Sequence, residues 1–394
     1  MFDKIKLSVF ESIVNNQNFD DEEPLLAEVL GSRKIFTQNP TEIGYFTQSG
    51  GQLHYNDTTG LGIINIPIGS TKSGYTKNKG QKAEKRQPLI GTSLSEGFDD
   101  YQRTSLDQIY SLDDLFESIH YLLNKGVLSR NDLKFLTLRR HLQKLMNIPL
   151  DRQLGQFNVI YWKELIFFTY DWENSLQKEE CTYTYTELLL QYSGFKFEQL
   201  LTDSETISKY FTVVKHKVNG IPVIYTAEID CGITKSPGLT NYVELKTHSH
   251  LLDNKLKTKN KFHHKLMKTY CQNKFISCKN AVVGFRSADF KLTSVKKYTD
   301  FELAKTLRAS PIFLTRTCSI NTDHIFQWYK LIISWICERK IEDSDECQVF
   351  KLSFKREGEL MDSHLCFQTV KKEEANKIFK KVVPTWFREF CEAQ

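Results

Sequence analysis

Hydrophobic residues recur along the chain with two periods, one typical of helices and one typical of strands. Between Ser111 and Gly126 they return every three or four positions, which predicts a helix that begins at a capping-box-like Ser-Leu-Asp-Asp and ends at the glycine. The same spacing predicts further helices over residues 131–146, 263–275, 324–337 and 373–381.

Runs rich in β-branched and aromatic residues predict two hairpins. The first covers residues 156–172 and turns at Lys163 and Glu164. In the second, Asn219 and Gly220 supply the two positive-φ residues of a type I′ turn. Residues 211–218 should therefore pair antiparallel with residues 221–230. Two more strands are expected, over residues 242–247 and 280–286.

The order of these elements predicts the fold class. Strands and helices alternate without a strict βαβ rhythm, and hairpins are present, so we expect an α+β or mixed α/β fold with mixed, twisted sheets flanked by helices. The whole chain, 1–394, is interpreted as one catalytic domain. A basic, flexible loop near residues 70–88 is the one candidate linker. Its core, 72–86, carries six basic residues and one acidic residue, which fits either a solvated loop or an arm that contacts phosphates.

Composition narrows the class of protein. The 394 residues are 40% hydrophobic and 12% aromatic, enough to bury a core without disulfides. All nine cysteines lie at or beyond Cys181 and form no CxxC pair, which favours a reducing compartment. Neither a signal-peptide pattern nor a membrane-length apolar run is present, so we expect a soluble intracellular protein without a membrane partner. The net charge of +5 is only a weak indication that the protein binds polyanions.

Charged residues on two predicted strands form the first chemical pattern. Side chains alternate between the faces of a strand, so Glu228 and Asp230 project from one side. On the next strand Glu244 and Lys246 share a face. If the two strands are adjacent, three carboxylates and one ammonium group meet.

Carboxylates brought so close resist ionising together unless a cation joins them. Oxygen ligands suit hard ions such as Mg²⁺ or Mn²⁺, and a nearby lysine can hold a phosphate oxygen. An Asp followed by Glu-x-Lys on the next strand is the minimal core of PD-(D/E)xK phosphodiesterases. The other interpretation is two amphipathic strands with solvated charged faces.

Two further segments favour the catalytic interpretation. Gly-Phe-Lys-Phe-Glu places Glu198 after an apolar run. On the predicted helix over 263–275, Lys265, Lys268 and Gln272 share one face. The adjoining stripe of Met267, Cys271 and Phe275 is interpreted as core packing.

Five short motifs then carry a resemblance to a known family. LRRHLQK, GFKFE, AEIDC, YVELKT and HKLMKTYCQ, in this order, resemble the successive motifs of the DXO family of decapping exoribonucleases. The likeness extends to PTEIGYF at 40–46, VVGFR at 282–286 and PTWF at 384–387, and so covers nearly the whole chain. It points to a fungal, cytoplasmic-type member.

The resemblance implies a metal site with a PD-(D/E)xK-like nuclease core. By similarity, Glu228, Asp230 and Glu244 coordinate two divalent ions, Mg²⁺ or Mn²⁺, and the backbone carbonyl of Leu245 is a further ligand. Glu198 acts in the same cluster, partly through bound water. An activated water attacks in line while the second ion stabilises the leaving oxygen.

The resemblance also implies the substrate, an RNA 5′ end that is capped or phosphorylated. Lys246 and Gln272 are expected to contact the scissile phosphate, and Arg139 the 5′-terminal phosphate. Family members remove incomplete or aberrant caps and degrade the exposed 5′-monophosphate RNA from 5′ to 3′. This chain has Arg140 where the family usually has Gly and Gln143 where Thr is common. These bulkier residues could crowd the pocket for a 5′ triphosphate.

Other interpretations stay open at this point. The chain could be a weakly catalytic partner that stabilises a larger 5′–3′ exonuclease, a DNA endonuclease with the same core, or a 5′ pyrophosphohydrolase alone. The histidines at 248, 250, 263 and 264 invite a zinc interpretation, against which solvated or helix-capping roles are weighed. No stable protein partner is evident from the sequence, and the cytoplasm is favoured over the nucleus.

Overall fold

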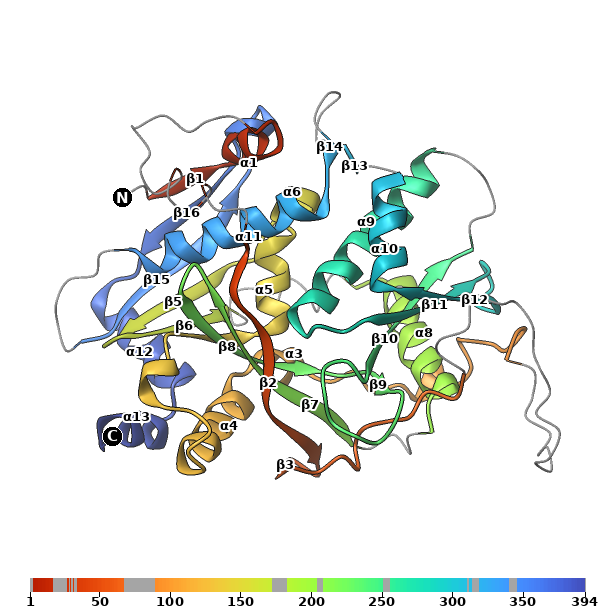
Figure 1. Cartoon of the computed structure of the whole chain (residues 1–394), viewed down its shortest axis with the longest axis horizontal. Coiled ribbons are helices and arrows are strands. Elements are labelled where there is room, and N and C mark those ends of the chain that lie inside the picture. Colours follow the sequence, from red (N-terminus) through yellow and green to blue (C-terminus); the bar gives the residue numbers. More distant parts are fainter. Residues whose placement is uncertain are drawn as a thin grey trace.

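Two β-sheets of unequal size organise the molecule (Figure 1). The computed structural model describes residues 3–16, 34–66, 89–171, 183–203, 208–250, 256–309, 312–313, 319–339 and 346–393, with the single positions 27, 29 and 31. The basic run at 72–86 lies outside the described residues.

The larger sheet has ten strands in the order β1-β16-β15-β5-β6-β4-β8-β7-β2-β3. Most neighbours are antiparallel, but β4 runs parallel to both β6 and β8. In chain order these strands are β1 (Lys4–Lys6), β2 (Phe36–Ser49), β3 (Gln52–Tyr55), β4 (Phe135–Leu138), β5 (Phe157–Trp162), β6 (Leu165–Tyr170), β7 (Lys209–Val218), β8 (Ile221–Glu228), β15 (Gln348–Lys355) and β16 (His364–Thr369).

The smaller sheet has four strands in the order β12-β11-β10-β9, and β10 runs parallel to β11. A separate two-stranded pair also forms. These strands are β9 (Cys231–Gly232), β10 (Tyr242–Ser249), β11 (Asn280–Arg286), β12 (Leu292–Thr299), β13 (Ile312–Phe313) and β14 (Ser319–Ile320).

Helices lie around both sheets, and α8, α9 and α10 accompany the smaller one (Figure 1). The α-helices are α1 (Leu7–Val14), α3 (Leu106–Tyr110), α4 (Asp113–Asn124), α5 (Arg139–Met146), α6 (Ile148–Asp151), α8 (Tyr185–Leu201), α9 (Leu256–Phe275), α10 (Asp300–Ala309), α11 (Thr322–Cys337), α12 (Lys372–Val382) and α13 (Thr385–Ala393). Three 3₁₀ turns, η1 (Phe98–Asp100), η2 (Arg130–Asp132) and η3 (Leu360–Asp362), complete the described elements.

Both predicted hairpins are confirmed. β5 and β6 pair antiparallel around Lys163, whose φ is 52°. β7 and β8 pair antiparallel around Asn219 and Gly220, whose φ angles are 49° and 80°. The second strand of this hairpin ends at Glu228, however, two residues earlier than expected.

Two helix predictions need correction. The helix expected over 131–146 forms only from Arg139, because Phe135–Leu138 is the buried strand β4 between β6 and β8. Four apolar residues buried on both faces carry no period that separates strand from helix. At α4 the expected capping box is absent: Leu112 is the N-cap residue, and Ser111 instead accepts a hydrogen bond from the Asp113 amide at 3.0 Å. The other end of this helix is as predicted, because Gly126 follows the C-cap residue with a positive φ of 69°.

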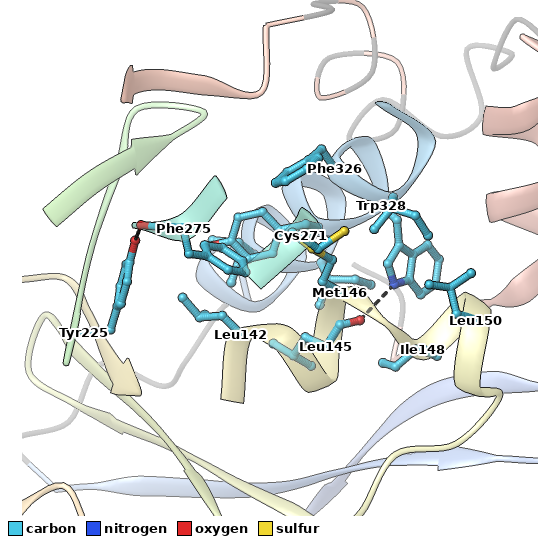
Figure 2. Packing of buried hydrophobic residues seen from close by; sticks show 14 of the residues in the cluster. Leu142, Leu145, Met146, Ile148, Leu150, Tyr225, Cys271, Phe275, Phe326 and Trp328 are labelled. Carbon is cyan, nitrogen blue, oxygen red and sulfur yellow. Dashed lines mark hydrogen bonds between the residues drawn. The ribbon is translucent and has the colours of Figure 1, made fainter. Parts of the chain in front are cut away.

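The main core lies where α5, α9 and α11 pack together (Figure 2). Trp328 of α11 is fully buried and donates its indole N–H to the Leu145 carbonyl of α5 at 3.2 Å. The Tyr225 hydroxyl of β8 donates to the Phe275 carbonyl at the end of α9. Met267, Cys271 and Phe275 are buried here, as predicted. These contacts fix α5, and with it the arginines at its first turn.

A second close contact fixes α8 on the smaller sheet. Phe197 of α8 is fully buried among Val243, Leu245 and Val282. Its ring lies over Gly284 of β11, where an added Cβ would be 2.4 Å from Phe197 Cε2. Only glycine lets the helix approach this closely. Since Glu198 follows Phe197, this contact determines where its carboxylate lies.

No helix in the described part of the chain is long and apolar enough to cross a membrane. The seven described cysteines are all free thiols, and most of them are buried.

Candidate active site

Four carboxylates from three segments of the chain face a cleft that two adjoining cavities form. Glu228 ends β8, Asp230 follows it by two residues, Glu244 lies on β10 and Glu198 on α8. All four lie close enough for the charges of Asp230, Glu228 and Glu244 to raise the pKa of Glu198. The sequence-predicted cluster is therefore brought together.

Glu228 is held between two cations. Its Oε1 lies 3.2 Å from Lys209 Nζ, and its Oε2 lies 3.3 Å from Arg140 Nη2. Burial alone would raise the pKa of Glu228, but the charges of Lys209 and Arg140 hold it below its usual value. This carboxylate is ionised and already paired.

Asp230 joins the two sheets. Its Oδ2 accepts a hydrogen bond from the Leu245 amide of β10 at 2.7 Å, and the next residues form β9, which pairs antiparallel with β10. The expectation that Glu228 and Glu244 lie on adjacent strands was wrong, because β8 and β10 belong to different sheets. The chain leaves one sheet at Glu228 and enters the other at Cys231. Burial and the charge of Glu244 raise the pKa of Asp230 to about 7.

Glu244 is the most deeply buried of the four, with 2% of its surface exposed. Its Oε1 accepts hydrogen bonds from Lys246 Nζ on the same strand and from Gln272 Nε2 on α9. Its Oε2 lies 3.7 Å from Arg139 Nη1. Burial lowers the pKa of Lys246, but the negative charges of Glu244 and Asp230 outweigh this effect and raise the pKa above its usual value.

Glu198 projects into the cleft from α8. The helix begins at a capping box in which the Glu187 amide donates to Thr184 Oγ1 at 3.2 Å and the Thr184 amide donates to Glu187 Oε2 at 2.8 Å. Burial first, and then the negative charge of Asp230, raise the pKa of Glu198 well above its usual value. A carboxyl in this setting favours the protonated form until a cation arrives.

Arg139 and Arg140 begin α5 directly after β4. Arg139 is 6% exposed and donates from Nη2 to the Glu228 carbonyl at 2.7 Å, while its Nη1 is buried without a hydrogen-bond partner. Arg140 reaches the Glu228 carboxylate and lies over the Tyr110 ring, 5.6 Å from its centroid. Arg139 therefore lies against the carboxylate cluster, between the Glu228 carbonyl and the Glu244 carboxylate.

The three polar residues predicted to share one face of α9 have different partners in the structure. Gln272 reaches Glu244, and Lys265 donates to the Thr247 carbonyl at the end of β10. Burial, and then the charge of Lys246, lower the pKa of Lys265 to about 8. Lys268 instead forms an ion pair with Asp151 of α6, away from the four carboxylates.

The cluster contains the carboxylate oxygens that a divalent ion requires, but several of these oxygens are already in contact with side chains of the protein. Within the described residues, no three His, Cys, Asp or Glu side chains converge closely enough to hold a metal ion as they lie. The carboxylate of Glu228 contacts Lys209 and Arg140, and that of Glu244 contacts Lys246 and Gln272. Carboxylate oxygens are the ligands that Mg²⁺ and Mn²⁺ prefer. The residues thus fit such ions, provided that these contacts are exchanged on binding.

Two cavities flank the cluster. One, of about 880 Å³, is lined by Arg139, Gln143, Lys246 and Gln272 and reaches the first turn of α4. The other, of about 730 Å³, is lined by Glu198 and by the aromatic residues Tyr101, Tyr110, Tyr192 and Phe195. Both are lined by Arg140, Lys209, Glu228 and Asp230. The carboxylates therefore lie where two open spaces meet.

Lys209 is the site residue that sequence analysis missed. In the β7–β8 hairpin Phe211 pairs with Glu228, so Lys209, two residues before Phe211, lies diagonally opposite Glu228 on the same face. The hairpin register follows from the predicted turn at Asn219 and Gly220. This signal was present in the sequence and could have found the residue.

Comparison with known proteins gives a consistent family likeness. The family model described as "RAI1 like PD-(D/E)XK nuclease" matches residues 38–388. The decapping and exoribonuclease protein of Xenopus laevis is 23% identical over 326 residues, which cover 74% of this chain and 76% of that protein. The decapping nuclease RAI1 of Debaryomyces hansenii is 25% identical over 264 residues, covering 58% and 66%.

Solved structures share the fold. Candida albicans Rai1, crystallised with pU5 and Mn²⁺, superposes with a TM-score of 0.75 at 18% identity and covers 92% of this chain and 97% of its own. Kluyveromyces lactis Dxo1, crystallised with manganese, has a TM-score of 0.57 at 16% identity, covering 86% and 94%. At these identities the likeness establishes a common architecture.

Proposed function

Because this chain belongs to the family of RAI1-like PD-(D/E)XK nucleases, we propose that it hydrolyses RNA at the 5′ end with the help of divalent metal ions. It removes incomplete or aberrant caps and then degrades the exposed 5′-monophosphate RNA from 5′ to 3′. The observation that carries this proposal is the convergence of Glu198, Glu228, Asp230 and Glu244 on one cleft beside Lys246. The names of the relatives, and the pU5 and Mn²⁺ bound by Candida albicans Rai1, point the same way.

The proposed ligands of two Mg²⁺ or Mn²⁺ ions are the four carboxylates and the backbone carbonyl of Leu245. When bound, such ions supply positive charge that lowers the pKa of an attacking water and stabilises the leaving oxygen. The support from this chain is that burial, and then the charges of neighbouring carboxylates, raise the pKa of Glu198 and of Asp230, a state that a bound cation would relieve.

The basic groups that now pair with the carboxylates have a second role in this proposal. Lys246 and Gln272 both contact Glu244, and they are the groups assigned to the scissile phosphate. Arg139, whose Nη1 is ion-paired with Glu244 but makes no hydrogen bond, is assigned to the 5′-terminal phosphate, which a guanidinium can grip with two parallel hydrogen bonds. Lys246, Gln272 and Arg139 would each exchange a carboxylate contact for a phosphate contact when ions and RNA bind.

The two cavities suit a single-stranded polyanion. Arg140 and Lys209 line both of them, and the aromatic residues Tyr101, Tyr192 and Phe195 line the second. Proteins that hold single-stranded nucleic acid commonly combine a basic groove with aromatic rings on which bases stack. Single-stranded RNA is therefore the favoured substrate over duplex DNA.

The experiment is a substrate panel with the purified chain and Mg²⁺ or Mn²⁺. One RNA sequence is prepared with monophosphate, triphosphate, unmethylated-cap and methylated-cap 5′ ends, and duplex DNA is the comparison. We expect cleavage of at least the monophosphate and an incomplete cap. Cleavage of duplex DNA alone would identify a DNA endonuclease. No hydrolysis of any substrate, together with a co-purifying exonuclease, would identify a non-catalytic partner.

The compartment and assembly are also part of the proposal. We assign the chain to the cytoplasm and to action without a stable protein partner, on the resemblance to a cytoplasmic-type member of the family. Fluorescence microscopy of the tagged chain and the mass of the purified species test both assignments. Nuclear accumulation would contradict the first, and a stoichiometric partner the second.

A further inference from the structure

Glu42 on β2 is a partly buried carboxylate outside the cleft. The pairing of β2 with β7 shifts register between Glu42 and Gly44, which is the signature of a β-bulge. Bulges re-aim the side chains beside them. Here the Glu42 carboxylate is in contact with two hydroxyl groups that belong to different sheets.

The first hydroxyl belongs to the larger sheet. Thr212 of β7 is fully buried, and its Oγ1 donates to Glu42 Oε1 at 2.6 Å. Across the hairpin Thr212 pairs with Ala227, the residue before Glu228. Glu42 is thus tied to β7, the strand that pairs with β8, which ends at Glu228.

The second hydroxyl belongs to the smaller sheet. Tyr242, the first residue of β10, is fully buried and donates its hydroxyl to the same Glu42 oxygen at 2.5 Å. That hydroxyl also lies 2.9 Å from the Tyr210 hydroxyl and accepts the Gly238 amide at 3.2 Å. Tyr242 precedes Glu244 by two residues, so the two side chains lie on the same face of the strand.

The distance between the carboxylates of Glu228 and Glu244 therefore depends on how the two sheets are held together. Glu228 and Glu244 come from strands of different sheets, so no ladder of strand pairing between β8 and β10 sets their separation. The described residues that line the two cavities do not include Glu42. Its hydrogen bonds to Thr212 and Tyr242 join β7, the pairing partner of β8, to β10 of the smaller sheet.

We propose that Glu42 is a positioning residue: by accepting hydrogen bonds from Thr212 and Tyr242, it sets the spacing of the Glu228 and Glu244 carboxylates and so the affinity for divalent ions. This inference rests on the proposed metal-dependent function. Glu42 acts through these neighbours and contacts neither ion nor RNA. Partners that orient metal ligands in this way typically contribute about ten- to a hundredfold to metal affinity.

The test is a calorimetric titration of Mn²⁺ into the full chain without RNA, which measures binding and not activity. Glu42→Ala removes the acceptor and should weaken Mn²⁺ binding by about tenfold or more. Glu42→Gln keeps a carbonyl oxygen that can accept both hydroxyl groups, so it should bind nearly as the unmodified chain does. Tyr242→Phe removes one donor and should give an intermediate loss, and it tests the same link if Glu42→Ala fails to fold.

Tyr161→Phe is the matched control for a simple loss of stability. It removes a buried hydrogen bond from the Tyr161 hydroxyl to the Ile336 carbonyl, 2.8 Å long and away from the cleft. It should lower the melting temperature and leave Mn²⁺ affinity unchanged. If Glu42→Ala or Tyr242→Phe binds Mn²⁺ as tightly as the unmodified chain, the positioning role is overturned while the proposed function stands. If the unmodified chain binds no Mn²⁺ even with an uncleavable RNA present, the proposed function fails, and this inference fails with it.

Discussion

At the scale of single residues, the charge on the carboxylates proposed to bind metal ions is the decisive property. We expect Asp230→Asn and Glu244→Gln each to abolish hydrolysis while the fold is retained, because each change removes a ligand charge and preserves the shape of the side chain. Hydrolysis rates at saturating Mn²⁺ and circular dichroism spectra measure the two effects. If either variant keeps most of its activity, the ligand assignment is wrong.

The raised pKa values of the cluster predict a pH dependence. The pKa of Asp230 is about 7 in the fold, above its usual value, so folding of the ion-free chain takes up protons. Its free energy of unfolding should therefore fall as pH rises from about 4 to about 7. Ions bind the deprotonated carboxylates, so Mn²⁺ affinity should rise over the same range with release of protons.

Calorimetric titrations in two buffers of different ionisation enthalpy measure that proton release directly. Asp230→Asn is the control, because it removes the titrating group and should flatten the pH dependence of stability. A Mn²⁺ affinity that does not change between about pH 6 and pH 8 would contradict the account of the shifted carboxylates.

Arg139 and Arg140 should behave differently although they are neighbours. Arg139→Ala should weaken cleavage of 5′-monophosphate and capped RNA by roughly ten- to a hundredfold, as expected for a lost charge-assisted hydrogen bond of about 1.5–3 kcal/mol. Since Arg139 also donates to the Glu228 carbonyl, some loss of metal affinity should accompany it. Arg140→Gly removes the side chain that pairs with Glu228 and leaves space in its place. This variant should accept a 5′ triphosphate better than the unmodified chain does.

Cleavage rates of both variants on monophosphate and triphosphate RNA distinguish the two roles. Equal and small effects from both variants on both substrates would show that the first turn of α5 does not line the 5′-end pocket.

At the scale of elements, the contact between α8 and β11 is the most sensitive to a small change. Gly284→Ala places a methyl group 2.4 Å from a ring atom of the fully buried Phe197. Overpacking of this kind costs about 1–3 kcal/mol, and the shift of α8 should displace Glu198 and lower the hydrolysis rate. Denaturant unfolding measures the loss of stability, and the hydrolysis rate measures the displacement of Glu198.

The partner substitution checks that prediction. Phe197→Leu combined with Gly284→Ala relieves the clash and should recover part of the lost activity. Gly358→Ala is the control, because an added Cβ there meets nothing within 4 Å, and stability should change by less than about 0.5 kcal/mol. A Gly284→Ala variant as stable and active as the original would show that α8 tolerates the shift.

Elements with a clear period were predictable from the sequence, and a short buried element was not. The hairpin turning at Asn219 and Gly220 was found because the turn type demands those residues. β4 was taken as part of a helix because its four residues are buried on both faces and carry no alternation. Glu228 and Asp230 nevertheless line the same two cavities, although β8 ends at Glu228 and strand alternation does not extend to Asp230.

At the scale of the whole molecule, the meeting of the two sheets could not be predicted. The sequence placed Glu228 and Glu244 on neighbouring strands, whereas the chain changes sheets between Glu228 and Cys231. That crossing depends on long-range contacts such as the hydrogen bond from the Leu245 amide to Asp230. The order of the motifs was enough to identify the site, but not its geometry.

Metal binding should stabilise the whole chain, because only the folded state brings the carboxylates together. At a Mn²⁺ concentration one hundred times its Kd, the gain is about 2.7 kcal/mol, which raises the melting temperature by a few degrees. Thermal unfolding with Mn²⁺ and an uncleavable RNA measures it. The Glu244→Gln variant should show a smaller shift, and no shift in the unmodified chain would contradict the metal site.

The central claim is hydrolysis at the 5′ end through the carboxylate cluster, and one measurement tests it most directly. A linear 5′-monophosphate RNA and a circular RNA of the same sequence are incubated with the purified chain and Mn²⁺, beside the Asp230→Asn variant. We predict degradation of the linear RNA by the unmodified chain alone, with the circle intact. Cleavage of the circular RNA at a comparable rate, or degradation of the linear RNA by Asp230→Asn, would contradict the account.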